Sequence, residues 1–109
     1  MAWFSIIGAV SSATIGFYNQ EKRAYLSQIK SEPLEIISCT GNVSLKDCQP
    51  FIHAHIELGD KQGKAFGGHL FSDTIIFAGE FKLEELKGKP MERAPDRTTG
   101  LMLWSKNSE

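Results

Sequence analysis

Apolar and polar residues alternate along several short stretches of this chain, and turn-forming residues separate one stretch from the next. The alternation is strict from Ser12 to Phe17, and it returns over Thr74 to Leu86. A period of two places every second side chain on one face of a β-strand, whereas a helix needs a period of about 3.6. Other runs rich in β-forming residues are 3–10, 34–40, 43–45, 51–59, 64–71 and 100–105. The pattern predicts a mainly antiparallel β-sheet with few or no helices.

Two segments leave helix and strand open. Tyr25, Leu26 and Ile29 have helical spacing, yet residues 24–30 are few for a stable helix. Residues 83–86 either continue the strand before them or turn helical. We expect Ser11–Ser12 to break the first strand, residues 88–97 to form a proline-bearing loop, and residues 106–109 to form a loose tail.

Length and composition bound the class of protein. A chain of 109 residues predicts one domain, which we place at residues 1–105. Twelve basic and thirteen acidic side chains give a net charge of −1, which argues against a protein that binds DNA by charge alone. No apolar run is long enough to cross a bilayer, so no membrane partner is expected. Cys39 and Cys48 are interpreted as reduced thiols of a cytoplasmic protein, with a bridge between them left open.

All three histidines lie in one predicted hairpin, between positions 53 and 69. His53 and His55 are two residues apart and therefore point to the same face of a strand. Their apolar neighbours, Ile52, Ala54, Ile56 and Leu58, are expected on the opposite, core-facing side.

The turn of this hairpin decides the position of His69. A two-residue loop would place His69 opposite Ala54, on the apolar face. A three-residue loop of Lys61, Gln62 and Gly63 places it opposite His55, and Gly63 supplies the positive φ that such a loop needs at its third residue. The three-residue loop also keeps Phe66 and Leu70 on the core face, so it is the predicted one.

Three imidazoles on one patch favour zinc or another first-row divalent metal with an open fourth position. His53, His55 and His69 are the predicted ligands. Glu57 shares their face and is a candidate for a fourth ligand or for a hydrogen-bond partner of a ligand. Glu80 is a further candidate, and in an enzyme either carboxylate would transfer protons. The alternative is that the histidines simply occupy a solvated or subunit-facing surface of the sheet.

The hairpin sequence PFIHAHIELGDKQGKAFGGHL, residues 50–70, resembles the signature of the plant and prokaryote conserved (PPC) domain family. The resemblance extends to IGAV at 7–10, to PLEIIS at 33–38 followed by GNVS at 41–44, to Glu80, and to the segment 95–101. Family members begin with a further strand and a helix before the IGAV segment. We expect this chain to lack both, as a fragment, a mis-started reading frame or a short natural form.

The resemblance implies an α+β domain built around an antiparallel sheet, commonly a homotrimer, with a fold similar to that of the zinc enzyme α-acetolactate decarboxylase. It also implies that His53, His55 and His69 bind a metal, and that DNA is a candidate partner. The chain has no Arg-Gly-Arg-Pro hook for the minor groove, which weakens the DNA expectation.

Two functions follow from these observations. The favoured hypothesis is a homotrimeric module with a three-histidine metal site and a DNA-associated or regulatory role. The alternative is a metal-dependent enzyme, a lyase or hydrolase acting on a small oxygenated substrate, with Glu57 or Glu80 moving protons. Whether the chain is an enzyme is left open at this point.

Overall fold

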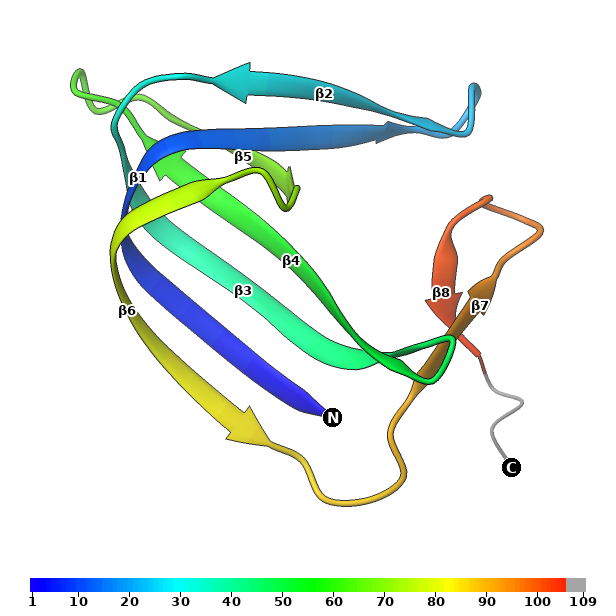
Figure 1. The fold of residues 1–109 in the computed structure, drawn as a ribbon. Coiled ribbons are helices and arrows are strands. Elements are labelled where there is room, and N and C mark those ends of the chain that lie inside the picture. The colour runs from blue at the N-terminus through cyan, green and yellow to red at the C-terminus, as the bar shows by residue number, and fades with distance from the viewer. Residues whose placement is uncertain (106–109) are drawn as a thin grey trace.

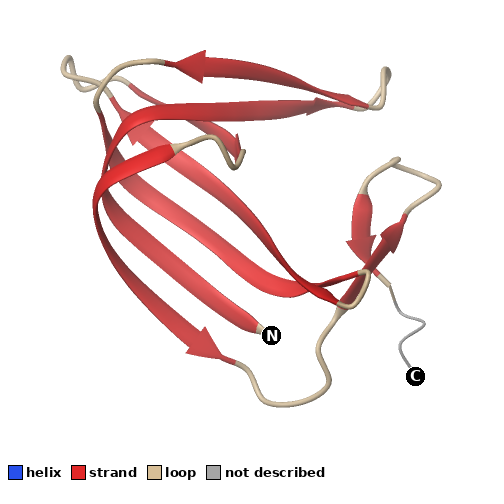
Figure 2. Ribbon diagram, in the orientation of Figure 1, coloured by secondary structure: helices blue, strands red, loops and turns tan. Residues whose placement is uncertain are grey.

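A computed structural model describes residues 1–105 as one curved sheet of eight strands (Figure 1). In chain order the strands are β1 (Ala2–Asn19), β2 (Ala24–Lys30), β3 (Leu34–Lys46), β4 (Gln49–Gly59), β5 (Ala65–Leu70), β6 (Ile75–Glu85), β7 (Glu92–Pro95) and β8 (Met102–Trp104). The described residues contain no helix (Figure 2), and hence none that could span a membrane. The expected α+β class is therefore corrected to all-β for this part of the chain. The expected tail, 106–109, lies outside the described residues.

The segment 24–30, for which the sequence left helix and strand open, is a strand. Each of its residues pairs with the second half of β1, from Ala13 opposite Lys30 to Asn19 opposite Ala24. Cross-strand pairing satisfies the backbone of a segment that is too short to be a stable helix. The rings of Tyr18 and Tyr25, which lie directly opposite each other, add an edge-to-face contact at 5.1 Å between centroids.

Strand β1 is long and bent, and the predicted break at Ser11–Ser12 is wrong. Its first half pairs with β3 and β6, and its second half pairs with β2 and β5. Because β3 pairs with β4 and β4 pairs with β5, the strands β1, β3, β4 and β5 form a closed ring. At Gly8, φ is +148° and an added Cβ would lie 2.1 Å from the carbonyl oxygen of Ala78, so this position requires glycine.

The core is formed by side chains from β1, β3 and β4. Its buried apolar residues are Val10, Ala13, Ile15, Leu34, Ile36, Cys39, Ala54, Ile56 and Leu58. Phe66 and Leu70 pack against it, as the hairpin pattern predicted. Ile52 was also expected in the core but is 64% exposed. The buried part of β4 starts at Ala54, so Ile52 lies on the predicted face of the strand but outside its buried part.

The last two strands form a hairpin at the far end of β3. Strand β7 pairs in parallel with β3, with Leu45 opposite Glu92, and antiparallel with β8. Residues 88–97, predicted to be a loop, therefore include a short strand. The hydroxyl of Tyr18 donates a hydrogen bond to the carbonyl oxygen of Thr99 and so links this hairpin to the second half of β1.

Candidate metal centre

The turn between β4 and β5 is built by Asp60 and Gly63. A carboxylate oxygen of Asp60 accepts hydrogen bonds from the backbone N–H groups of Gln62 and Lys64, both at 2.9 Å. The backbone N–H of Gly63 donates to the carbonyl oxygen of Asp60, and φ of Gly63 is +82°. These bonds close the three-residue loop that the sequence predicted, with glycine at the left-handed position.

This loop sets the register that brings the histidines together. His55 lies directly opposite His69, and His53 lies two residues before His55 on β4. One ring nitrogen from each of the three histidines lies within 4.8 Å of the other two. The ring centroids are 5.1 Å apart for His53 and His55, 5.3 Å for His53 and His69, and 5.8 Å for His55 and His69. The predicted convergence of the three imidazoles is thus present.

The ring of His69 is held by aromatic neighbours. Tyr25 lies at 4.7 Å and Phe71 at 4.9 Å between ring centroids. Gly16, which pairs with His69, leaves space for Phe71, because a Cβ there would meet that ring at 2.5 Å. Nδ1 of His69 is buried and has no hydrogen-bond partner among the described residues. A buried ring nitrogen without a partner is unfavourable unless something else satisfies it, and a metal ion does so.

The surroundings keep two of the rings neutral. The pKa of His53 is lowered from 6.5 to about 4, first by burial and then by the nearby Arg93 and the other two histidines. The pKa of His69 is lowered by burial and by His55. At neutral pH both rings are therefore deprotonated, which is the form that binds metals.

The donor set fits a divalent first-row ion. On a tetrahedral zinc ion with bonds of about 2.0–2.1 Å, the ligand nitrogens lie about 3.4 Å apart, so a small inward rotation of the rings would close the cluster. Three imidazole ligands also leave one tetrahedral position open. The buried Nδ1 of His69 supports the same conclusion.

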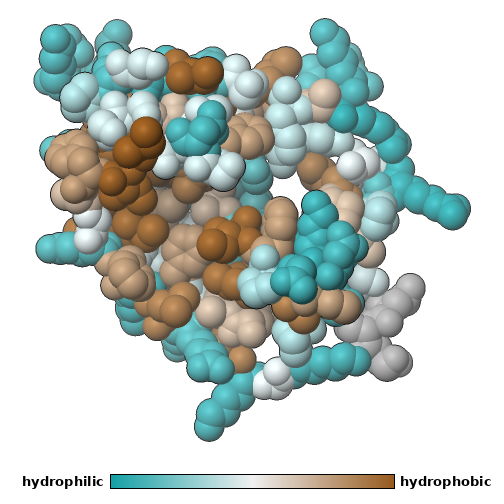
Figure 3. Space-filling view, in the orientation of Figure 1, coloured by the Kyte–Doolittle hydropathy of each residue, from teal (hydrophilic) through white to brown (hydrophobic). Residues whose placement is uncertain are grey.

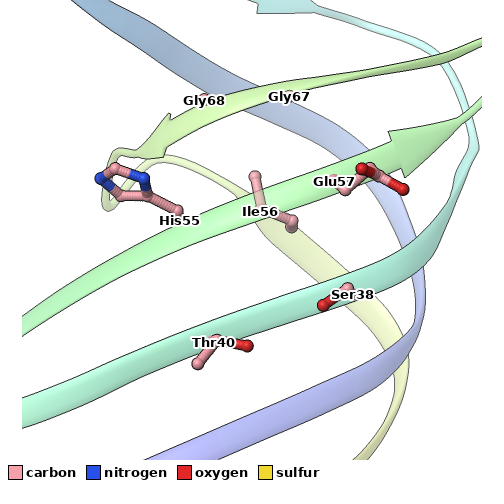
Figure 4. Close-up of a pocket in the computed structure, with 7 residues that line it drawn as sticks. All are labelled: Ser38, Thr40, His55, Ile56, Glu57, Gly67 and Gly68. Carbon is pink, nitrogen blue, oxygen red and sulfur yellow. The ribbon is translucent and has the colours of Figure 1, made fainter.

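A pocket of about 400 Å³ lies beside His55 (Figure 4). Its lining residues come from β3, β4 and β5 and are Ser38, Thr40, His55, Ile56, Glu57, Gly67 and Gly68. Glu57 thus lies in the pocket next to a cluster member. Glu80 lies on β6 opposite Ile7, is exposed, and lines neither this pocket nor a smaller one beside His53. The structure therefore brings Glu57, but not Glu80, to the site.

Gly67 and Gly68 let the neighbouring strands approach β5 closely. An added Cβ on Gly67 would lie 2.1 Å from the carbonyl oxygen of Ile56, and one on Gly68 would lie 2.5 Å from that of Gly16. The sequence allowed either a ligand or another backbone to approach these glycines. The distances show that the backbone of β4 approaches Gly67 and the backbone of β1 approaches Gly68.

Arg93 is a residue near the site that sequence reasoning missed. It lies on β7, and its guanidinium donates hydrogen bonds to Oδ1 of Asn42 at 3.0 Å and to Oγ of Ser44 at 3.2 Å. Asn42 lies directly opposite His53, so Arg93 reaches the same face of the sheet as the histidines. Nothing local in residues 88–97 signals this position, because it depends on the parallel pairing of β7 with the distant β3.

Comparison with known families decides the classification. A model of the Plants and Prokaryotes Conserved (PCC) domain matches residues 1–87, which include the whole histidine hairpin. The chain belongs to the PCC domain family. This is the PPC family of the sequence resemblance, so that prediction is confirmed.

Several solved structures share the fold. A metal-containing protein from Archaeoglobus fulgidus is 51% identical, with a TM-score of 0.91 over 96% of this chain and 74% of its own. A plant- and prokaryote-conserved protein from Pyrococcus horikoshii is 42% identical, with a TM-score of 0.90 over 99% of this chain and 74% of its own. A protein from Bacteroides thetaiotaomicron, suggested to bind DNA, is 31% identical, with a TM-score of 0.84 over 95% and 72%.

Among curated proteins, the PCC chain is similar to the bifunctional protein GlmU of Synechococcus sp. strain JA-3-3Ab. The two are 31% identical over 99 residues, which are 90% of this chain but 15% of that protein. The chain thus spans a small part of the curated relatives that it matches.

Proposed function

We propose that this PCC-domain chain is a metal-binding module in which His53, His55 and His69 hold one divalent ion, with zinc as the favoured metal. The observation that carries the proposal is the convergence of three ring nitrogens, one from each histidine, within 4.8 Å of one another. The ring of His69 also carries a buried Nδ1 with no hydrogen-bond partner among the described residues. The relative from Archaeoglobus fulgidus, described as metal-containing, supports the assignment. When bound, such an ion supplies Lewis acidity at an open position.

Elemental analysis of the purified protein tests this centre directly. We expect about one zinc, or one manganese, iron, cobalt or nickel, per chain. The variant His55→Ala should lower the metal content and weaken affinity by at least 10-fold, since one of three ligands is lost, whereas Glu80→Gln on the distant strand β6 should leave both unchanged. A metal-free protein whose zinc affinity is the same with and without His55 would refute the proposal.

We also propose that the module works as a homotrimer in the cytoplasm, with a DNA-associated or regulatory role. Exposed apolar side chains on β6 support assembly, and the free state of Cys39 and Cys48 supports a reducing compartment. The relative from Bacteroides thetaiotaomicron supports DNA as a partner. Gel-shift titration at several salt concentrations tests it, and absence of binding at low salt eliminates the DNA role.

The pocket beside His55 favours a second candidate function, a metal-dependent enzyme for a small oxygenated substrate. Glu57 and the hydroxyl-bearing Ser38 and Thr40 line this pocket, so a carboxylate and two hydroxyls share it with His55, one of the three proposed ligands. In this role Glu57 holds or moves a proton while the hydroxyls orient the substrate. Screening the zinc-loaded protein against hydroxy and keto acids, with Glu57→Gln as the inactive control, tests it. The likeness to α-acetolactate decarboxylase stays a prediction.

A further inference from the structure

Arg93 carries a positive charge with neutral partners. Its Nε donates to Oγ of Ser44 at 3.2 Å, its Nη1 to the carbonyl oxygen of Met102 at 3.1 Å, and its Nη2 to Oδ1 of Asn42 at 3.0 Å. All three acceptors are uncharged, so none of these hydrogen bonds neutralises the charge of the guanidinium. The three bonds use three of the five N–H groups of a guanidinium, which leaves one on each terminal nitrogen outside them.

Aromatic rings orient this guanidinium. Its Cζ lies 5.5 Å from the ring centroid of Phe51 and 5.4 Å from that of Trp104. The indole N–H of Trp104 also donates to Oγ of Ser44 at 3.0 Å, so Ser44 joins both side chains. These contacts fix the side chain in one place, and an arginine that is already positioned loses little conformational freedom when it binds an anion.

The guanidinium is hydrogen-bonded to a residue that shares a pocket with two of the histidines. Its partner Asn42 is the cross-strand neighbour of His53, and Asn42, Thr40, His53 and His55 line a shared pocket of about 190 Å³. One cavity therefore runs from the residue that holds Arg93 to two of the three proposed metal ligands.

The charge balance of this cavity indicates what it binds. Imidazole ligands carry no negative charge, so they leave the two positive charges of a divalent ion uncompensated, and the guanidinium adds a third. The cluster itself contains no carboxylate, and Glu57 lines the larger pocket beside His55 but not this one. We propose that Arg93 and the open metal position together bind a small oxyanion, a carboxylate or phosphate group, with one oxygen on the metal and another on the guanidinium. This inference rests on the proposed metal centre and names the ligand class of that site.

Calorimetric titration of the metal-loaded full chain tests the inference. The probes are glycolate and inorganic phosphate, which separate carboxylate from phosphate, and glycolamide as the uncharged analogue. We expect an anion to bind at least 10-fold more tightly than glycolamide. Arg93→Met should weaken anion binding by about 10-fold or more and leave glycolamide unchanged, whereas Arg93→Lys should recover part of the affinity because it keeps the charge.

Arg23→Met is the matched control. Arg23 also donates to the last hairpin, through Nη2 to the carbonyl oxygen of Thr98 at 3.2 Å, but Asn42 is not its partner. It should leave anion affinity unchanged. Circular dichroism and metal content show whether Arg93→Met is folded. If it is not, the inference is tested by the anion affinity of Arg93→Lys and by the ratio of the glycolate and glycolamide affinities of the wild type. Equal binding of glycolate, phosphate and glycolamide by a metal-loaded protein overturns the inference alone; a wild type that holds no metal overturns it together with the proposed function.

Discussion

His53 is a residue whose protonation the fold opposes. Its pKa is about 4 in the folded chain against 6.5 as the reference value, so between these two pH values the unfolded chain binds more protons at this position. The free energy of unfolding should therefore fall as pH falls from 6.5 toward 4. Above pH 6.5 this position should cause no further change, because its ring is neutral in both the folded and the unfolded chain.

Urea unfolding of metal-free protein at a series of pH values measures this dependence. His53→Gln should flatten the curve in this window, because glutamine does not titrate, while His69 still contributes in the same direction. A wild-type midpoint that stays constant across the window would contradict the lowered pKa.

Gly63 is the residue on which the hairpin register depends. Its φ of +82° lies where a Cβ is unfavourable, although no atom within 4 Å would touch one. Gly63→Ala should therefore destabilise the fold through the backbone alone, by about 1–2 kcal/mol. Gly63→Asn should cost less, since asparagine tolerates this conformation. Chemical denaturation of both variants checks the order, and equal stability of Gly63→Ala and the wild type would show that the loop does not need glycine.

The elements differ in how far their sequence could predict them. The β4–β5 hairpin was predicted in full register because its information is local: Gly63 fixes the loop, and the apolar positions fix the face. Strand β2 was left open, because Tyr25, Leu26 and Ile29 also fit a helical spacing and only pairing with β1 decides between the two states.

The long-range pairings were not predictable from the chain alone. The site's connection to Arg93 depends on the parallel contact of β7 with β3, for which residues 88–97 carry no local signal. The exposure of Ile52 was missed for a related reason. Alternation predicts which face a side chain occupies, whereas only the bend of β1 determines how far that face is covered.

For the whole molecule, the surface of β6 predicts assembly. All of its residues are exposed, including Ile75, Phe77, Phe81 and Leu83 at 56–73%, and apolar side chains gather on the side of the molecule where β6 lies (Figure 3). Sedimentation equilibrium should give about three times the chain mass of 12.1 kDa. Phe81→Lys should shift the mass toward one chain, with Lys61→Ala on the exposed β4–β5 turn as control. A wild type that sediments as a single chain would contradict the trimer.

The length and bend of β1 have a consequence for how the molecule comes apart. This single strand is hydrogen-bonded to four others, and both halves of the sheet are attached to it. Because both sets of pairings share this one strand, we expect loss of structure in one half to weaken the other, so that the ring unfolds in one concerted event. The histidine hairpin pairs with β1 at Gly16 and His69 and with β3 along β4, so its opening should accompany this event.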